Sequence, residues 1–289
     1  MHDRSCIIVS MNKLTTEKRI AVVRALVEGC SIRSVVRMTG VAKNTVVKLL
    51  CDLGAACAAQ HAALVNSLSP KQIQCDEIWS FCHAKQKNVP AECQGVFGHG
   101  DVWTWTALDS DTKLIISWHV GLRTGADAHA FMADLACRVL NLPQLTADGF
   151  TSYPEAVYAA FGERVDYAQL YKLYQAERAG EARYRPAACT GTREAAVIGE
   201  PDPAHISTSH VERQNLTMRM SMRRFTRLTN AFSKKVENLE HAVALHFMHY
   251  NFCRIHQTLR ATPAMAAAVT DRLWDVADLI GLLDRGPPN

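Results

Sequence analysis

The feature of this sequence that most constrains its fold is a change in hydrophobic period close to residue 70. Before it, apolar residues recur every three to four positions, which is typical of helices. After it, short apolar and β-branched runs begin with 73–81, which is typical of strands. Ser69-Pro70 lies at the change and would end a helix. The chain is therefore expected to consist of a helical N-terminal part and a larger α/β part, with the boundary at 66–72.

The N-terminal part is expected to form three short helices. An apolar stripe over 20–27 ends at Gly29, Ser31 is placed to cap a second helix that ends at Gly40, and a third begins near Ala42. Two helices joined by a short glycine-containing turn indicate a helix-turn-helix, whose second helix lies in the major groove of DNA.

The residues at the start of the third helix are then candidates for contact with DNA. Asn can pair with adenine, and Lys can pair with guanine or phosphate. The predicted DNA-binding residues here are Lys43, Asn44 and Lys48. The alternative is a plain three-helix bundle with solvated lysines.

The second part alternates strands with helices. Strands are expected over 73–81, 102–108, 114–120, 145–147 and 164–174, with helices over 127–140, 153–161, from 209 and over 236–250. This order is typical of a ribonuclease H-like α/β domain. The predicted organisation is an N-terminal extension (1–14), a helix-turn-helix domain (15–54), a helical linker (55–72), a ribonuclease H-like catalytic domain (73–250) with an irregular insert at 176–207, and a C-terminal helical region (251–289).

Three acidic residues are placed to meet at one site. Asp76 lies within the first predicted strand, Asp148 follows a short buried strand, and Glu212 lies on a later helix. Ligands collect at the carboxyl ends of strands in open α/β sheets. Three hard carboxylate ligands favour Mg²⁺ or Mn²⁺, and a pair of such ions can activate an attacking hydroxyl and stabilise the leaving oxygen in phosphodiester cleavage. We therefore predict that Asp76, Asp148 and Glu212 are catalytic and bind two divalent ions.

Other acids compete for these roles. Glu77 neighbours Asp76, but alternation along a strand sends it to the opposite face, so only one of the two is expected to face the metals. Asp109 and Asp111 lie where a hairpin must turn, and Asp is common in turns because it bonds to its own backbone. We expect both to be turn residues.

A basic segment follows Glu212. Residues 213–235 contain seven Lys or Arg and no acid, and residues 1–50 contain nine against three acids, although the net charge of the chain is only +4. Such patches indicate contact with nucleic acid, the alternative being a solvated helix face. Helical spacing places one group on the face of Glu212 and a second group further round. The predicted DNA-binding residues are Asn215, Arg219 and Arg223 in the first group and Arg224 and Arg227 in the second.

The sequence also indicates the cellular compartment in which the protein is expected to work. The chain has 289 residues and ten cysteines, without a Cys-x-x-Cys pair, a secretory signal or an apolar run of 18 residues. Free thiols in apolar helical patterns pack as small hydrophobic groups. These features favour a cytoplasmic protein in a reducing compartment. Met1 and Met11 are both possible start sites.

Several phrases together resemble insertion-sequence transposases of the DDE type, most closely the IS-one family. They are Asp-Glu-Ile-Trp-Ser-Phe at 76–81, Asp-Gly at 148–149, Glu-Arg-x-Asn at 212–215, Arg-Arg-x-Thr-Arg at 223–227, Tyr-Asn-Phe at 250–252, His256 and Thr-Pro-Ala-Met at 262–265. The resemblance spans about residues 12–280.

The resemblance implies a ribonuclease H-like catalytic domain and Mg²⁺-dependent cleavage and transfer of DNA strands, with Asp76, Asp148 and Glu212 as the catalytic acids and Arg219 in the basic position that commonly follows the glutamate. It also implies a helix-turn-helix that binds terminal inverted repeats. Such a protein would act on double-stranded DNA in the bacterial nucleoid, as a homodimer or larger assembly, with no membrane partner. The alternatives are a host nuclease or junction resolvase of the same fold and a non-catalytic helix-turn-helix regulator.

Overall fold

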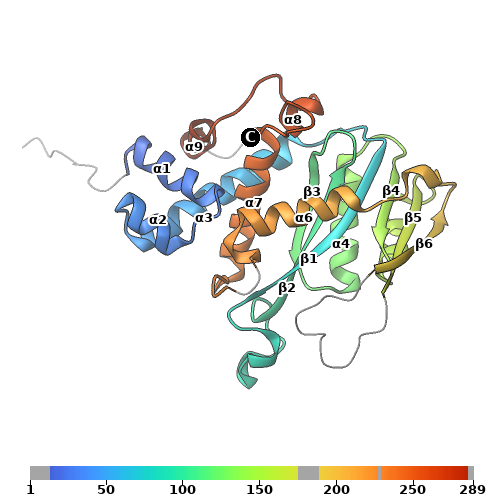
Figure 1. The fold of residues 1–289 in the computed structure, drawn as a ribbon, viewed down its shortest axis with the longest axis horizontal. Helices are drawn as coiled ribbons and strands as arrows, with labels where there is room; N and C mark the ends of the chain where they lie inside the picture. Colours follow the sequence, from blue (N-terminus) through green and yellow to red (C-terminus); the bar gives the residue numbers. More distant parts are fainter. Residues whose placement is uncertain (1–13, 175–188, 227–228, 286–289) are drawn as a thin grey trace, which may run out of the picture.

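A mixed six-stranded sheet forms the centre of the protein, with strand order β3-β2-β1-β4-β5-β6 (Figure 1). The computed structural model describes residues 14–174, 189–226 and 229–285. Strands β1, β4 and β5 are parallel neighbours, whereas β2, β3 and β6 are antiparallel to theirs. The strands are β1 (Gln72–Cys82), β2 (Gly100–Asp109), β3 (Ile115–Gly121), β4 (Gln144–Asp148), β5 (Asp166–Tyr174) and β6 (Cys189–Ile198). The α/β class is confirmed.

The five predicted strands are all present, and the turn between β2 and β3 forms as expected. The carboxylate of Asp109 accepts hydrogen bonds from the backbone N–H of Asp111 at 3.0 Å and from the hydroxyl of Thr112 at 2.5 Å. A side chain that bonds its own turn stabilises the reversal of the chain. The interpretation of Asp109 as a turn residue is confirmed.

The prediction of an irregular insert over 176–207 was wrong for its central part. Residues 189–198 form β6, which pairs antiparallel with β5 at the edge of the sheet. None of the ten residues of β6 is buried, so neither face of the strand needs apolar side chains. Residues 176–188 of the insert lie outside the described residues.

Helices cover both faces of the sheet. On one face lie α4 (Gly125–Arg138) and α5 (Tyr153–Phe161), whose aromatic side chains surround the fully buried Trp105 of β2. On the other face α6 (Ser209–Ser221) contacts β1 and β2 (Figure 1). Trp118 of β3 lies against His61 and Phe247, which belong to α3 (Lys43–Leu64) and α7 (Val236–Phe252).

The first two helices form as the sequence predicts. They are α1 (Thr16–Val27) and α2 (Ile32–Thr39). The hydroxyl of Ser31 accepts a hydrogen bond from the N–H of Ser34 at 3.1 Å, and Gly40 ends α2 with φ of 68°, a conformation that favours glycine. Gly29, with φ of 78°, follows α1.

The predicted third helix and the predicted helical linker are one helix. α3 runs without a break for 22 residues, through the boundary expected at residue 54, and it ends at Leu64. Gly54 lies within it because α7 passes so close that a Cβ at this position would be 2.4 Å from the Cβ of His241. The close packing of α7 therefore requires glycine at position 54, and this glycine does not end the helix.

The N-terminal helices and the sheet share one continuous apolar core. Buried residues of α1 and α3, such as Val23 and Leu53, belong to the same cluster as Ile73 of β1 and Phe247 of α7. The α1–α2 turn also contacts the C-terminal end of α6: a Cβ on Gly29 would lie 3.1 Å from the carbonyl oxygens at 220 and 221. The predicted helix-turn-helix is thus packed directly on the helix that carries Glu212.

The C-terminal region is held by caps and by a buried amide. The hydroxyl of Thr262 accepts from the N–H of Met265 at the start of α8 (Pro263–Ala266), whose first residue is proline, and α9 (Val276–Arg285) follows. Asn251 of α7 accepts from the N–H of Ile115 at 3.0 Å and donates to its carbonyl at 2.9 Å, which joins α7 to β3. Four 3-10 turns complete the described elements: Gln86–Asn88, Ala91–Cys93, Pro203–His205 and Arg223–Phe225. Within the described ranges, no helix combines the length and apolar character needed to cross a membrane.

The contact at Gly54 gives a direct test of the α3–α7 packing. We expect Gly54→Ala to lower the free energy of unfolding by about 1–3 kcal/mol, because the new methyl group overlaps the backbone of α7. The matched control is Gly281→Ala in α9, where nothing lies within 4 Å of an added Cβ. That variant should gain up to about 1 kcal/mol from helix propensity. Denaturant unfolding of both proteins checks the prediction, and equal effects would contradict the packing.

Candidate active site

Two of the three predicted catalytic acids lie on neighbouring parallel strands. Cys75 of β1 is in register with Ala147 of β4, so Asp76 and Asp148 follow side by side. The Asp148 carboxylate also accepts from the N–H of Phe150 at 3.0 Å, in the turn that leads to α5. The central parallel pair of strands therefore delivers both aspartates to one edge of the sheet, as expected for this class of fold.

The third acid faces the same cavity. A cavity of about 350 Å³ is lined by residues from β1, β4, β5 and the start of α6: Asp76, Asp148, Gly149, Leu170, Tyr171, Lys172, Thr208 and Glu212. All three predicted acids thus border one space, although 135 residues of sequence separate Asp76 from the last of them. A cavity of this size with a polar, acidic lining suits a small charged group or an ion better than an apolar ligand.

Glu77 also reaches the cluster, although only one of the two neighbours was expected to face the metals, and which of them does so stays a prediction. Ligand atoms of Asp76, Glu77 and Asp148 all lie within 4.8 Å of one another. Alternation does place the two side chains on opposite faces: Asp76 bonds Asn215 of α6, and Glu77 accepts from the hydroxyl of Tyr153 of α5. The Glu77 carboxylate nevertheless approaches Asp148, because Asp148 lies at the strand end, where both faces meet.

Burial and mutual repulsion change the acidity of this cluster. Burial, reinforced by the charge of Asp148, raises the pKa of Asp76 to about 7 and the pKa of Glu77 to about 8. Hydrogen bonds from the N–H of Glu77 and the hydroxyl of Tyr153 oppose these shifts. Carboxylates that repel one another in a buried site gain most from a divalent cation, and their oxygen atoms are the ligands that Mg²⁺ and Mn²⁺ prefer.

Two cations form ion pairs with acids of the site. The guanidinium of Arg123, which follows β3, lies 3.1 Å from Glu77 and 3.0 Å from Asp148. The ammonium of Lys172 on β5 lies 2.5 Å from the carboxylate of Glu212, which also accepts from the hydroxyl of Thr208. Neither cation was singled out from the sequence.

The start of α6 is fixed by a side chain of β1. The buried Gln74 Oε1 accepts from the backbone N–H of His210 at 2.8 Å and of Val211 at 3.1 Å. These two N–H groups lie in the first turn of α6, where no intrahelical partner exists. Gln74 lies two residues before Asp76, so one strand carries one acid and orients the helix that carries Glu212.

Asn215 is placed differently from its prediction as a DNA contact. Its side chain is 3% exposed, and its Nδ2 donates to the Asp76 carboxylate at 2.7 Å. Its Oδ1 is buried without a hydrogen-bond partner. Asn215 therefore positions Asp76 from the α6 side, and burial keeps it away from a DNA phosphate in this conformation.

The Gln74 contact can be tested separately from catalysis. Gln74→Ala leaves two N–H groups at the start of α6 without acceptors, one of them on the fully buried Val211, and we expect a loss of about 1–3 kcal/mol in the free energy of unfolding. Gln72→Ala on the same strand is the control, since Gln72 is half-buried. Hydrogen exchange of the His210 and Val211 amides should accelerate in the first variant only. Unchanged exchange would rule out this role for Gln74.

The predicted contacts of the helix-turn-helix are available at the surface. Lys43 and Asn44 are exposed in the first turn of α3, and Lys48 is exposed with its ammonium 2.5 Å from Asp52. An exposed ion pair of this kind contributes little to stability, so Lys48 can exchange Asp52 for a phosphate at small cost. DNA contact by these residues stays a prediction.

The arginines of the basic segment after Glu212 differ in their exposure and contacts. Arg219 is half-buried on α6, and Arg223 is exposed. Arg224 turns inward: its Nε donates to the hydroxyl of Ser233 at 2.8 Å, and burial lowers its pKa. The prediction that Arg224 contacts the DNA backbone is therefore not supported, because its guanidinium is bound within the fold. Arg227 lies outside the described residues.

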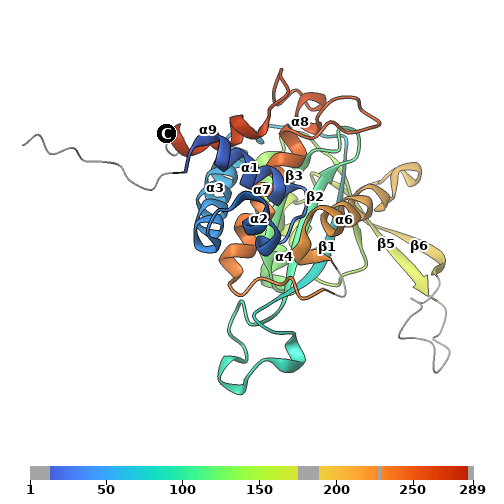
Figure 2. The same cartoon turned by 60° about the vertical axis from the view of Figure 1, so that its left-hand side comes forward.

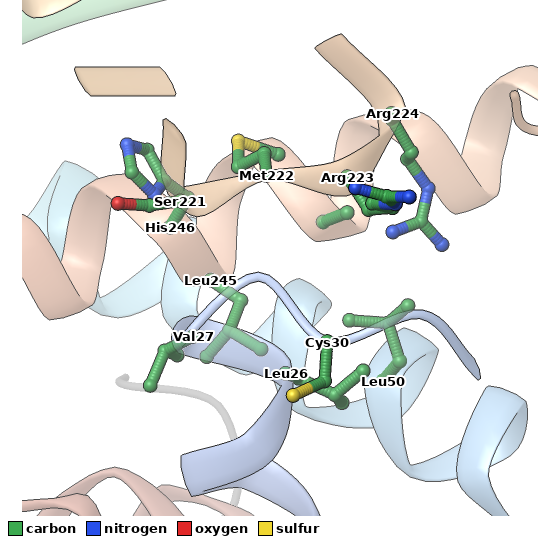
Figure 3. Close-up of a pocket in the computed structure, with 11 residues that line it drawn as sticks. Leu26, Val27, Cys30, Leu50, Ser221, Met222, Arg223, Arg224, Leu245 and His246 are labelled. Carbon is green, nitrogen blue, oxygen red and sulfur yellow. The ribbon is translucent and has the colours of Figure 1, made fainter. Parts of the chain in front are cut away.

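A second, small cavity separates the basic segment from the N-terminal helices. Arg223 and Arg224 lie on the segment that crosses over α1 and α3, above a cavity of about 30 Å³ (Figure 3). Leu26, Val27 and Leu50 form much of its floor. Its volume is that of about one or two water molecules. We therefore interpret it as a small packing void between the helices and the basic segment, and not as a ligand site.

Comparison with known proteins adds no identification. No model of a known protein family matches the chain, and no curated protein matches it significantly. Function must therefore be argued from the site.

Proposed function

We propose that this protein is a DNA transposase of the DDE type, which cleaves DNA at the ends of its element and transfers the ends to a new site. The observation that carries the proposal is that Asp76, Asp148 and Glu212 border one cavity at the edge of the central parallel strands. The motifs that resemble the IS-one family fall on these same positions. The strand order β3-β2-β1-β4-β5 loosely resembles a ribonuclease H-like domain, the fold that we propose for this part.

The donor set fits divalent metal ions. Asp76 and Asp148, with Glu77 close by, offer hard oxygen ligands within 4.8 Å of one another, and Glu212 faces them across the cavity. When bound there, Mg²⁺ or Mn²⁺ would supply Lewis-acid activation of the attacking hydroxyl and stabilisation of the leaving oxygen. We assign Asp76, Asp148 and Glu212 as the ligands. Glu77 is the less suitable candidate, since Tyr153 and Arg123 already bind its carboxylate.

The remaining residues hold this geometry. Asn215 orients Asp76, Gln74 fixes the start of α6, and Lys172 and Thr208 bind Glu212. Preorganised side chains of this kind reduce the reorganisation needed when substrate binds. In the proposed reaction, water breaks a P–O3′ bond at the element end and frees a 3′-hydroxyl. That hydroxyl then attacks a phosphodiester of the target, forms a new P–O3′ bond and releases a target 3′-hydroxyl.

The proposed organisation extends to the N-terminal helices. In it, Lys43, Asn44 and Lys48 contact the terminal inverted repeats, and two ends are joined by a dimer or larger assembly. The exposed first turn of α3 supports this use, because the N-terminal residues of a recognition helix face base edges.

The deciding experiment uses the DNA that flanks the reading frame. We expect purified protein with Mg²⁺ or Mn²⁺ to nick that DNA at inverted repeats and to join pre-nicked ends to a plasmid. Joined products support a transposase. Cleavage without joining would support the host nuclease or resolvase, and specific binding without cleavage would support the non-catalytic regulator.

A further inference from the structure

An aromatic row extends from the acidic cluster along one face of the β1–β2 pair. It consists of Trp79, Phe81, Trp103 and Phe232. The ring centres of Trp79 and Phe81 are 5.8 Å apart, and those of Phe81 and Phe232 are 5.0 Å apart, with interplanar angles of 34° and 31°. Trp103 is the cross-strand neighbour of Trp79. Trp79 and Phe81, two residues apart on β1, project from the same face of the sheet as Trp103, and Phe232 lies against Phe81, so the four rings form one surface.

This surface is not covered by the helices of its face. Trp79 is 39% exposed. By contrast, Trp105, which lies two residues after Trp103 on β2 and under α4 and α5, is fully buried. The ends of β1 and β2 and the segment between them project beyond the helices (Figure 2). Large aromatic groups left open next to a polar site mark a place of binding more often than a defect of packing.

Cations lie at both ends of the aromatic row. The Arg123 guanidinium is 5.1 Å from the ring centre of Trp103 and also bonds Glu77 and Asp148. The Lys85 ammonium is 5.9 Å from the ring centre of Phe81. Rings interleaved with cations suit a strand of bases joined by phosphates, whereas the centres of protein–protein interfaces are depleted of lysine.

We propose that the aromatic row stacks unpaired bases of a DNA strand next to the candidate active site. Trp79 lies on the same face as Glu77 of the acidic cluster, two residues beyond it on β1, which corresponds to about 7 Å at the rise of a strand. The bases held there would belong to nucleotides adjacent to the phosphate at the acidic cluster. The proposal deepens the proposed function, since it describes how the same site would hold unpaired DNA, and it does not require that the DNA be cut.

The test measures binding alone, in EDTA so that no cleavage occurs. The probe is a fluorescein-labelled 15-nucleotide oligothymidylate, compared with a duplex of the same length. We expect Trp79→Ala to weaken binding of the single strand by about 5- to 150-fold, the range found for loss of one stacked base, and to leave duplex binding unchanged. Trp79→Phe, which keeps a ring, should lose less. Single-strand binding should also quench tryptophan fluorescence in the wild-type protein and less in Trp79→Ala.

The matched control is Tyr158→Ala, which removes an aromatic side chain that is 58% exposed on α5. Its binding of the oligothymidylate should equal that of the wild-type protein. Unfolding curves of all variants establish that the fold is kept. Equal single-strand affinity of Trp79→Ala and wild type would overturn the proposal, as would an equal loss for duplex and single strand. Loss of self-association with unchanged affinity for the single strand would overturn it too and make the row a protein interface.

The outcomes separate this proposal from the proposed function. A protein that cuts no DNA, but binds the oligothymidylate through Trp79, would retain the aromatic row as a binding surface and exclude the transposase. A protein that cuts and joins its ends, but binds the oligothymidylate equally without Trp79, would retain the transposase and exclude the stacking surface.

Discussion

Replacing Asp76 or Asp148 with Asn is expected to reduce metal-dependent DNA cleavage by about 10³-fold or more, while binding of the element ends is kept. Each substitution removes one charged oxygen ligand from the cluster of acids, and metal-based stabilisation of the transition state amounts to several kcal/mol. The shape of the side chain hardly changes. Glu212→Gln should have a similar effect. Single-turnover cleavage of labelled end DNA measures the rate, and a gel-shift assay measures binding.

Two further carboxylates provide the controls. Asp111→Asn changes an exposed acid in the β2–β3 turn and should leave cleavage unchanged. Glu77→Gln should reduce cleavage by less than the aspartate substitutions, because Tyr153 and Arg123 bind the Glu77 carboxylate. If Glu77→Gln abolishes cleavage and Glu212→Gln does not, the third ligand is Glu77 and our assignment is wrong. Full activity of Asp148→Asn would remove the basis of the proposed function.

The metal-free protein is expected to become less stable as pH rises from about 4 to about 7, and Asp76→Asn is expected to weaken that dependence. The pKa of Asp76 is about 7 in the fold, raised from 3.8 by burial and by Asp148. Between these values the folded protein holds a proton that the unfolded chain has lost, so raising the pH favours unfolding. The pKa of Glu77, raised to about 8, acts in the same direction.

The size of the effect follows from the same shift. One group contributes about 1.4 kcal/mol per pH unit in this window, so Asp76 alone changes the free energy of unfolding by a few kcal/mol. Asp76→Asn should therefore be more stable than the wild type at pH 8 and nearly equal to it near pH 4. Its new amide can donate to the Asn215 Oδ1, which otherwise lacks a partner, once the Asn215 amide turns over. Urea unfolding of both proteins from pH 4 to pH 8 measures the difference.

Divalent metal should narrow the difference in stability between the two proteins at pH 8. A ligand that binds only the folded state at 100 times its Kd adds about 2.7 kcal/mol, so Mg²⁺ or Mn²⁺ should raise the Tm of the wild type and leave that of Asp76→Asn nearly unchanged. The increase should shrink toward pH 5, where protons compete for the same oxygen atoms. A wild-type Tm that ignores both metal and pH would contradict the metal site and the raised pKa together.

The parts of the fold that were predictable are those whose residues show a clear apolar pattern. Strand β1, the short strand before Asp148 and helix α5 were predicted because buried faces force hydrophobic residues into periodic positions. Strand β6 was missed because none of its residues is buried, and a strand without a buried face leaves no such pattern. The domain boundary expected after residue 54 falls within α3, where Gly54 serves the contact with α7, which local sequence does not reveal.

The acidic residues of the candidate site could be predicted from the sequence, but the residues that bind and orient them could not. Asp76, Asp148 and Glu212 follow recognisable elements, whereas Arg123 and Gln74 act through contacts between segments distant in sequence. Alternation along a strand assigns each side chain to one face, but it does not give the distance between side chains of opposite faces where a strand ends. The approach of Glu77 to Asp148 was therefore not predicted. Charge in a sequence likewise does not distinguish an exposed arginine from Arg224, whose guanidinium is bound within the fold.

The continuity of α3 limits how the proposed DNA specificity of this protein could be changed. Its first turn presents Lys43 and Asn44 to solvent, and 18 residues after Lys43 the buried His61 lies 3.1 Å from the carbonyl of Ile115 in the sheet. At about 1.5 Å per residue, one rigid rod about 30 Å long joins the exposed turn to the sheet. Exchanging the whole helical module for one of another specificity would therefore disrupt the sheet's own packing. Grafting new side chains onto the exposed turn is the change that this architecture tolerates.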